Sequence, residues 1–248
     1  MYRDEYEIID TITDNAEFAL LSVVQKASNI EFLMKVYKHN ESESKLLIEK
    51  KFAKENNLFT TLEHPRIARP LQHSSSRNVN YILFPFEQIT TLQQYIEKKE
   101  AIPLQECIKI SNQILDVLEY LHRKDVIYCN IHPERIFISE GKGIFIYDFG
   151  QSMTDLDQIN PEENEAVVTF PYFSPEQTGF TAFKPDQRSD LYCLGLLLYK
   201  LISGEIPFNG NSNSTGELID SMLKYELEPL KTIPKFLNEV LIKALRAS

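Results

Sequence analysis

The spacing of apolar residues changes along this chain, and that change restricts the fold more than any other feature. Three segments within the first ninety residues are rich in β-forming residues: 6–12, 17–24 and 30–37. Residues 42–62 have apolar side chains near helical spacing, and 67–86 returns to the strand pattern, with 73–80 (HSSSRNVN) expected as a turn. The first part of the chain is therefore predicted to be a small sheet with one helix.

After Thr91 the pattern becomes mostly helical. Residues 103–122 carry one apolar stripe, and 187–203 (QRSDLYCLGLLLYKLIS) are apolar almost all round, as expected of a helix inside a lobe. Two short β-rich runs lie between these helices, at 126–131 and 135–149, and they are followed by a polar stretch, 151–166, predicted to be an exposed loop. This order predicts an α+β protein.

Composition excludes several other classes of protein. The 248 residues carry a net charge of −10, which disfavours a nucleic-acid-binding surface. The three cysteines, Cys107, Cys129 and Cys193, have no metal-binding spacing and are odd in number, which favours a reducing compartment. The longest apolar stretch, 191–202, contains Lys200 and is too short to span a membrane. We therefore expect a cytoplasmic domain without nucleic-acid or membrane partners.

Short motifs in a fixed order give a more specific prediction. They are Lys35 in FLMK, Glu55 nine residues before His64, Asp148-Phe149-Gly150, Ser174-Pro175-Glu176, and Asp190 in RSDLYCLG. Each motif alone is a weak signal, but their order and intervals are those of the protein-kinase signature. From about Tyr6 to its end, the chain resembles the protein kinase family. The run PYFSPEQTG…RSDLYCLGLLLYKLISGEIPF is more narrowly similar to the kinase-like domains that open large bacterial multidomain signalling proteins.

The resemblance implies a two-lobed fold. The small, β-rich N-lobe with one helix would occupy residues 1–86, the hinge 87–91, and the larger, mainly helical C-lobe 92–248. The last helical segment of the family's large lobe is expected to be missing. Either the chain is a piece of a longer protein or the lobe ends unusually. The start at Met1 favours an N-terminal piece of something larger, with further domains or a protein partner expected.

The resemblance also assigns roles to individual residues. Nucleotide-binding roles fall on three of them: Lys35 for the α- and β-phosphates, Glu55 to orient Lys35, and Asp148 for Mg²⁺. Structural roles fall on Gly150, on Glu176 and on Asp190, which would brace the catalytic loop. Thr169 would lie beside the substrate. The alternatives from the residues alone are a surface lysine on an edge strand at Lys35 and a turn aspartate at Asp148.

The catalytic loop departs from the family pattern H-R-D-L-x-x-x-N, because residues 128–135 read YCNIHPER. Asn130 occupies the position of the catalytic base, and an amide is a poor proton acceptor, so a rate loss of about 10²–10⁴ is expected. Arg135 replaces the asparagine that holds the second Mg²⁺; it has donors only but could neutralise phosphate charge. His132 replaces a lysine that contacts the γ-phosphate, or is simply a half-exposed loop histidine.

The glycine-rich loop is also altered. Its three glycine positions hold Thr13, Asn15 and Phe18, whose side chains should keep the backbone away from phosphates. Phe18 could occupy part of the pocket. Cys129 replaces the arginine that pairs with a phosphorylated activation loop, so regulation by that route is not expected.

Three functions are consistent with these residues. The first is a pseudokinase that binds ATP through Lys35, Glu55 and Asp148 and acts as an allosteric or docking module. The second is a weakly active serine/threonine kinase with an atypical catalytic loop, and the third is a nucleotide-free interaction scaffold. ATP and Mg²⁺ are the cofactors that the first two imply.

Overall fold

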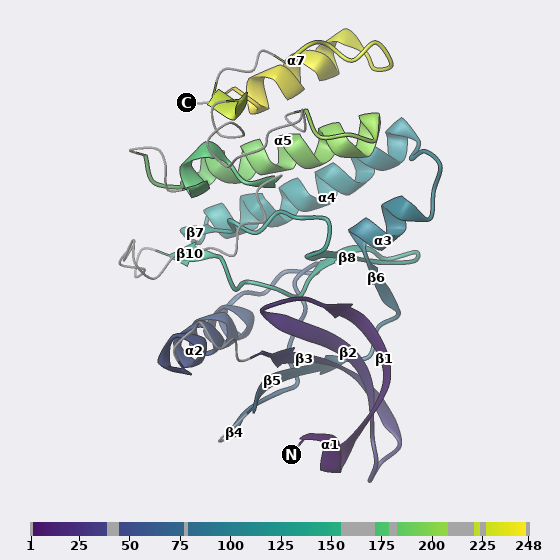
Figure 1. Cartoon of the computed structure of the whole chain (residues 1–248), viewed down its shortest axis with the longest axis vertical. Coiled ribbons are helices and arrows are strands. Elements are labelled where there is room, and N and C mark those ends of the chain that lie inside the picture. Colours follow the sequence, from purple (N-terminus) through teal and green to yellow (C-terminus); the bar gives the residue numbers. More distant parts are fainter. Residues whose placement is uncertain are drawn as a thin grey trace. The chain divides into compact units, whose positions relative to one another are not determined.

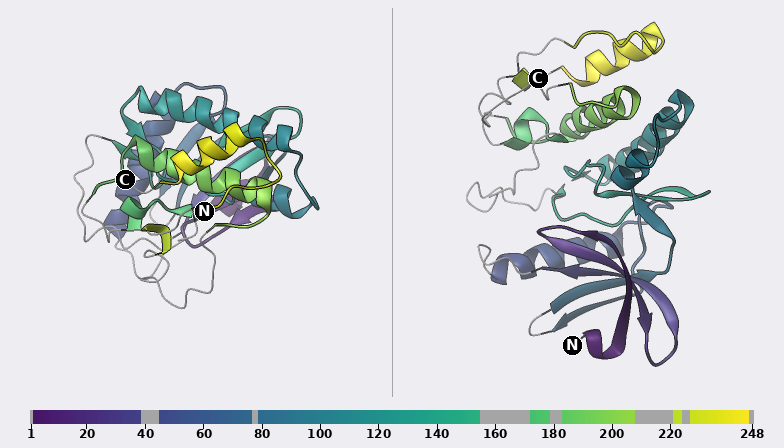
Figure 2. Two further views of the ribbon diagram at one scale, coloured as in Figure 1. Left: turned by 90° about the horizontal axis from the view of Figure 1, so that it is seen from above. Right: turned by 45° about the vertical axis from the view of Figure 1, so that its right-hand side comes forward.

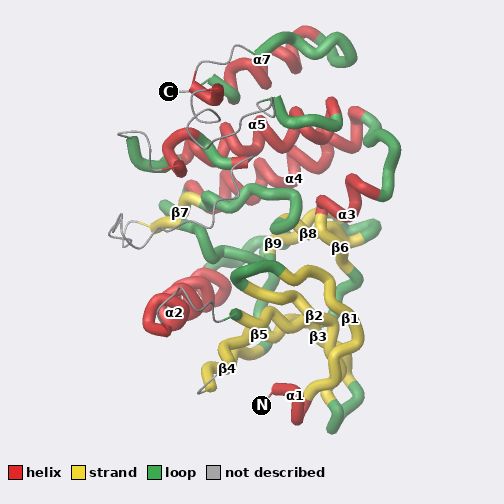
Figure 3. The backbone as a smooth tube through the Cα atoms, in the orientation of Figure 1, coloured by secondary structure: helices red, strands yellow, loops and turns green. Residues whose placement is uncertain are grey.

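The structure, a computed structural model, describes residues 2–38, 45–76, 79–154, 172–178, 183–207, 221–223 and 227–246. Its contacts divide the chain into two compact units, each made of two segments. The first unit is Met1–Tyr95 with Glu134–Gly150, and the second is Ile96–Pro133 with Gln151–Ser248. Strands dominate the first unit and helices the second (Figure 3). The α+β class is therefore confirmed, while the lobe boundaries near 86–91 stay a prediction.

A five-stranded antiparallel sheet forms most of the first unit. Its strands are β1 (Tyr6–Asp14), β2 (Phe18–Gln25), β3 (Ile30–Tyr37), β4 (Gln72–Ser76) and β5 (Val79–Pro85), and a short helix, α1 (Tyr2–Glu5), precedes them (Figure 1). The order β1-β2-β3-β5-β4 makes β3 the central strand. The same unit contains a second sheet of β6 (Ile89–Thr91), β8 (Ile136–Ser139) and β9 (Gly143–Ile146).

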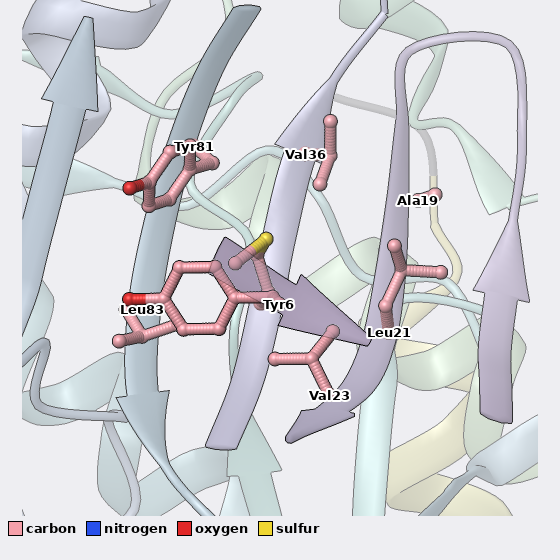
Figure 4. Packing of buried hydrophobic residues seen from close by; sticks show 8 residues of the cluster. Tyr6, Ala19, Leu21, Val23, Val36, Tyr81 and Leu83 are labelled. Carbon is pink, nitrogen blue, oxygen red and sulfur yellow. The ribbon is translucent and has the colours of Figure 1, made fainter. Parts of the chain in front are cut away.

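The two faces of β3 are buried for different reasons. Met34 and Val36 belong to an apolar cluster with Tyr6, whose ring meets that of Tyr81 edge-on at 6.3 Å (Figure 4). Leu33 and Lys35, which alternate with them, point to the opposite face and are also buried. The alternation along β3 therefore places a lysine inside the protein.

Helix α2 (Lys45–Thr61) packs beside the sheet of the first unit (Figures 1 and 2). Its Phe52 ring contacts Tyr37 of β3 at 5.1 Å, and its Phe59 ring contacts Phe84 of β5 at 5.2 Å. The helix was predicted over 42–62, close to the observed bounds. Since these aromatic contacts fix α2 against β3 and β5, they also fix the position of Glu55 on the helix.

The turn predicted at 73–80 is too long, because the antiparallel strands on either side extend into this range. Strand β4 continues to Ser76 and β5 begins at Val79, so most of the polar run is paired strand. Ser75 lies opposite Asn80, and their side chains are hydrogen-bonded at 2.9 Å. Because β4 is an edge strand, it does not need apolar residues on both faces, and its polarity resembles that of a turn.

The second unit is built around three longer helices, α4 (Leu104–His122), α5 (Gln187–Ser203) and α7 (Lys235–Ala244). Helix α5 packs against both α4 and α7 (Figure 2). Gly195 allows the second contact, because a Cβ there would lie 3.1 Å from the Ala244 Cβ. The predicted helices 103–122 and 187–203 are confirmed. No described helix is both long enough and apolar enough to cross a membrane.

Smaller elements complete the second unit. Strand β7 (Val126–Ile127) pairs with β10 (Met153–Thr154), and η2 (Pro175–Thr178) is a single 3₁₀ turn. The chain passes from the first unit to the second within α3 (Leu92–Glu97). The predicted loop 151–166 contains β10. Its residues 155–166 lie outside the described residues, as does Thr169.

Helix α5 begins with a capping box, and its removal gives a first prediction. The Asp186 carboxylate accepts the Arg188 N–H at 2.8 Å, and the Asp186 N–H donates to Ser189 Oγ at 3.1 Å. Asp186→Ala is expected to lower the free energy of unfolding by about 1 kcal/mol, because the backbone N–H groups of Arg188 and Ser189 lose the carboxylate that accepts them. Urea titration measures this; Asp116→Ala, at an exposed mid-helix position of α4, should cost no stability.

Candidate functional site

Lys35 lies at the centre of the first unit. It faces Leu20 of β2 and Ile82 of β5 in the sheet register, and it is 1% exposed. Its Nζ lies 2.6 Å from Glu55 Oε1 and 2.7 Å from Asp148 Oδ1. These positions exclude the alternative of a surface lysine on an edge strand.

Glu55 of α2 accepts three hydrogen bonds. Besides Lys35, the Phe149 N–H donates to its Oε1 at 2.6 Å, and the Tyr37 hydroxyl donates to its Oε2. Burial raises the pKa of Glu55, and the charge of Lys35 offsets this only in part. Burial and the neighbouring Glu55 charge together raise the pKa of Tyr37 well above its ordinary range, so its hydroxyl stays a donor.

Asp148 follows β9 and is the point where the charged groups of this unit converge. Lys35 Nζ and the Gly150 N–H (3.1 Å) contact its Oδ1, and a guanidinium nitrogen of Arg135 contacts its Oδ2. Burial alone would raise the pKa of Asp148, but Lys35 and Arg135 outweigh it and hold the pKa far below its ordinary range. A Cβ at Gly150 would lie 3.2 Å from Oδ1, so a larger residue would crowd this carboxylate.

Arg135 joins this group from the residue before β8. One of its guanidinium nitrogens donates to Asp148 and another to Glu17. Burial would lower the pKa of Arg135, but the two carboxylates outweigh it and raise the pKa. The structure therefore brings Lys35, Glu55, Asp148 and Arg135 together in one unit, with Glu17 added at the edge.

The loop between β1 and β2 covers this network. Asn15 Oδ1 accepts the N–H groups of Glu17 and Phe18, each at 2.9 Å, which makes a tight turn without glycine. Phe18 is buried, and Lys35 Nζ lies 4.2 Å from the centre of its ring, a cation–π distance. The cavity beside these side chains measures about 30 Å³, which leaves little room for a ligand. Phe18 and Glu17 thus fill space next to Lys35.

The side chains of this unit do not fit Mg²⁺ as they are arranged. Mg²⁺ requires near-octahedral oxygen ligands. Within the described ranges no group of three or more acidic, histidine or cysteine side chains is placed to hold a metal. Both carboxylate oxygens of Asp148 contact protein cations, and Arg135 supplies donors only. The arrangement is a closed network of ion pairs.

Asp190 organises the second unit's loop around Asn130. Its Oδ1 accepts the Cys129 N–H at 2.7 Å, and its Oδ2 accepts the Tyr128 N–H at 2.9 Å and the His122 Nε2–H at 2.8 Å. Cys129 has a φ of +53°. Asn130, the next residue, is buried. The bracing role that the resemblance implies for Asp190 therefore has a direct structural counterpart.

The remaining predicted residues also lie in the second unit. The ring of His132 meets that of Tyr172 edge-on at 4.7 Å. Glu176 accepts a hydrogen bond from Ser189 Oγ at 3.3 Å, which supplies a partner on α5. Gln177, which the motifs did not single out, donates to the Cys129 carbonyl at 2.8 Å.

Sequence reasoning missed Glu17, Tyr37 and Gln177. No local pattern marks Glu17, because its partner Arg135 lies 118 residues further along the chain. Tyr37 could have been found from the β3 alternation, since it follows Lys35 on the same face. No local pattern marks Gln177.

Comparison with known proteins supports the kinase resemblance. The protein kinase domain family matches residues 18–246. A probable serine/threonine-protein kinase of Clostridium perfringens is 29% identical over 219 residues, 87% of this chain and 31% of that protein. The serine/threonine-protein kinase PrkC of Bacillus subtilis is 27% identical over 200 residues, 79% of this chain and 30% of that protein.

A third relative matches along almost the whole chain. It is a probable serine/threonine-protein kinase of Clostridium acetobutylicum, 24% identical over 244 residues, which are 98% of this chain and 37% of that protein. The chain thus spans about a third of the length of these relatives. The predicted family and the two-lobed fold class are confirmed: this chain belongs to the protein kinase domain family.

Proposed function

We propose that this protein kinase domain is a pseudokinase, a nucleotide-responsive allosteric or docking module that transfers little or no phosphate. One observation carries the proposal. The carboxylate of Asp148, the D-F-G residue, is bonded on one oxygen by Lys35 and on the other by Arg135. A group that the family uses for Mg²⁺ is thereby neutralised by the protein's own cations.

The chemistry of the replaced residues points the same way. Phosphoryl transfer depends on metal ions at the phosphates and on a residue that orients the attacking hydroxyl. The guanidinium of Arg135 cannot coordinate a metal, and the Asn130 amide accepts protons poorly. Both replacements act on transfer, whereas neither removes the Lys35–Glu55 pair that the family uses for binding.

The retained pair supports a binding role. Lys35 and Glu55 are each 1% exposed, and they meet at 2.6 Å. Replacing such a buried ion pair by apolar residues is often neutral or stabilising, so stability alone does not require it. A role in ligand binding or in signalling to a partner accounts better for this network. The relatives are longer than this chain, which is consistent with a signal that passes from the kinase domain to further domains or to a separate protein.

The proposal predicts binding without transfer. In calorimetry, ATP should bind saturably, and Lys35→Ala should abolish binding because the phosphates lose their main point charge. Glu55→Gln, which keeps the shape of the side chain, should weaken binding without unfolding the domain. Lys26→Ala, at an exposed lysine of the same unit, should bind as the parent does. Circular dichroism establishes that each variant is folded.

A radiolabelled γ-phosphate assay on a general protein substrate and on the chain itself tests transfer. We expect no signal above that of Asp148→Ala. A signal that Asp148→Ala removes would contradict the proposal and support the weakly active kinase instead.

One observation favours a second candidate, the nucleotide-free interaction scaffold. Phe18 packs on Lys35, and the cavity beside them is far smaller than the roughly 300–1,000 Å³ of typical ligand pockets. For a scaffold, ATP should show no binding at millimolar concentration to the parent chain or to Phe18→Gly. Binding by the parent chain excludes the scaffold.

A further inference from the structure

We propose that Glu17 is an internal substitute for a phosphoryl group, and that a nucleotide binds without a divalent cation by replacing the Glu17 carboxylate on Arg135. This inference rests on the proposed nucleotide-binding function and names how the ligand is held. It follows from the contact between the guanidinium of Arg135 and the Glu17 carboxylate, within the network that contains Lys35.

The first step is the balance of charge in this network. Two cations, Lys35 and Arg135, face three carboxylates: Glu17, Glu55 and Asp148. Counted as ionised groups, two positive and three negative charges leave one excess negative charge. If Glu17 leaves, the two cations match the two remaining carboxylates in number, so an incoming anionic group takes the place of a carboxylate and is not added to the three already present.

The second step identifies which carboxylate can leave. Glu55 and Asp148 side chains are 1% and 2% exposed, whereas the Glu17 side chain is 24% exposed. Glu55 and Asp148 also accept backbone N–H groups, from Phe149 and Gly150 respectively. Glu17 can rotate toward solvent about its side-chain bonds while the turn at Asn15 stays intact. It is therefore the carboxylate that separates from the network at the lowest cost.

The third step is the chemistry of the incoming group. A guanidinium presents paired donors that match the oxygens of a carboxylate and of a phosphoryl group equally well. Arg135 thus offers a phosphoryl group the guanidinium nitrogen that Glu17 occupies, while its other nitrogen stays on Asp148. A metal would have to compete with Lys35 and Arg135 for Asp148, so adding Mg²⁺ should not improve binding.

Calorimetric titration with ADP, in EDTA and in excess Mg²⁺, tests this exchange. In EDTA, Glu17→Gln should bind ADP about tenfold more tightly than the parent chain, because the competing anion is removed. Mg²⁺ should change the affinity of the parent less than twofold. Arg135→Asn should weaken binding in EDTA at least tenfold and should make binding depend on Mg²⁺, because an amide oxygen can coordinate the metal.

The chain supplies a matched control pair. Arg69 and Glu63 form an exposed arginine–glutamate contact at 3.6 Å in the same unit. Glu63→Gln and Arg69→Asn make the same chemical changes away from the network, and both should leave ADP affinity unchanged. Titration with pyrophosphate tests whether the site binds a nucleotide or a free phosphate. A nucleotide site should bind ADP much more tightly than pyrophosphate, and the variants should rank in the same order of affinity for both ligands.

Several results would overturn the exchange. The exchange would be overturned if the parent chain bound ADP only with Mg²⁺, or if Glu17→Gln bound ADP with the affinity of the parent. Either result would leave the proposal of a nucleotide-binding pseudokinase standing. Absence of ADP binding in every variant would overturn the exchange and favour the scaffold. Phosphate transfer from ATP, by contrast, would contradict the pseudokinase proposal whatever the response to Glu17→Gln.

Discussion

Lys35→Met is expected to lower the free energy of unfolding by about 3–5 kcal/mol, the largest loss of stability predicted for a single change in the first unit. Methionine has nearly the length of lysine and fits beside Phe18, so the change removes a charge and leaves little empty space. It leaves the carboxylates of Glu55 and Asp148 buried without the cation that bonds both of them at 2.6–2.7 Å. Chemical denaturation measures the difference.

Lys38→Met is the matched control. Lys38 is three residues further along the chain and pairs with Asp14, but its side chain is 38% exposed and that of Asp14 is 54% exposed. An exposed ion pair contributes about 0–1 kcal/mol, so this variant should unfold almost as the parent does. Equal losses in the two variants would show that the buried network does not depend on Lys35.

The loss in Lys35→Met should also grow with pH. The pKa of Glu55 is raised above its ordinary value of 4.5, so its contribution to stability is present below that value and is lost as pH rises through the folded pKa. Removing Lys35 takes away a charge that lowers the pKa of Glu55, so that loss extends to higher pH. The deficit should therefore be smaller at pH 5 than at pH 8.

Asp148 adds a second loss to the deficit at neutral pH. Its pKa is lowered in the folded state, so it stabilises the fold above its unfolded pKa, and this contribution is lost as pH falls through the folded pKa. Lys35 is one of the two cations that lower it. The variant consequently loses part of this contribution at neutral pH. A deficit that does not change between pH 5 and pH 8 would contradict the raised pKa of Glu55.

Much of the fold could be predicted because its residues are patterned locally. The helix over 187–203 was bounded correctly, since Asp186 and Ser189 form a capping box and Gly204 adopts a φ of +80° after it. The β4 strand was missed because local polarity does not distinguish an exposed edge strand from a turn. The grouping of Glu134–Gly150 with the first unit depends on pairing between β6 and β8, which are distant in the sequence.

Only the site residues that belong to the regularly spaced motifs could be predicted from the sequence. Lys35, Glu55 and Asp148 were chosen by position, and the structure joins them through two ion pairs. The contacts of Arg135 could not be predicted in the same way. Its partner Glu17 is 118 residues away, and no local pattern connects a loop glutamate with an arginine before a strand. The sequence therefore indicated what Arg135 cannot do for a metal, and the structure shows what it binds instead.

The second large effect is expected at Asp190 in the second unit. Asp190→Asn should lower the free energy of unfolding by roughly 3 kcal/mol, although it removes no volume. The carboxylate accepts three hydrogen bonds, two of them buried, from the Tyr128 N–H and the Cys129 N–H, and one part-buried, from His122. An amide has one acceptor oxygen, and its NH₂ group would face at least one of these donors. That donor would be buried without an acceptor.

Hydrogen exchange makes this prediction specific to the loop. The Tyr128 and Cys129 amides should lose protection in Asp190→Asn at a denaturant concentration where the amides of α4 remain protected. Asp116→Asn, at an exposed position on α4, should change neither stability nor exchange. If Tyr128 and Cys129 stay protected in Asp190→Asn, these amides have other acceptors and Asp190 does not brace the loop. If only Tyr128 and Cys129 lose protection, then Asp190 holds the loop around Asn130 in place, even though this domain has Asn130 at the base position.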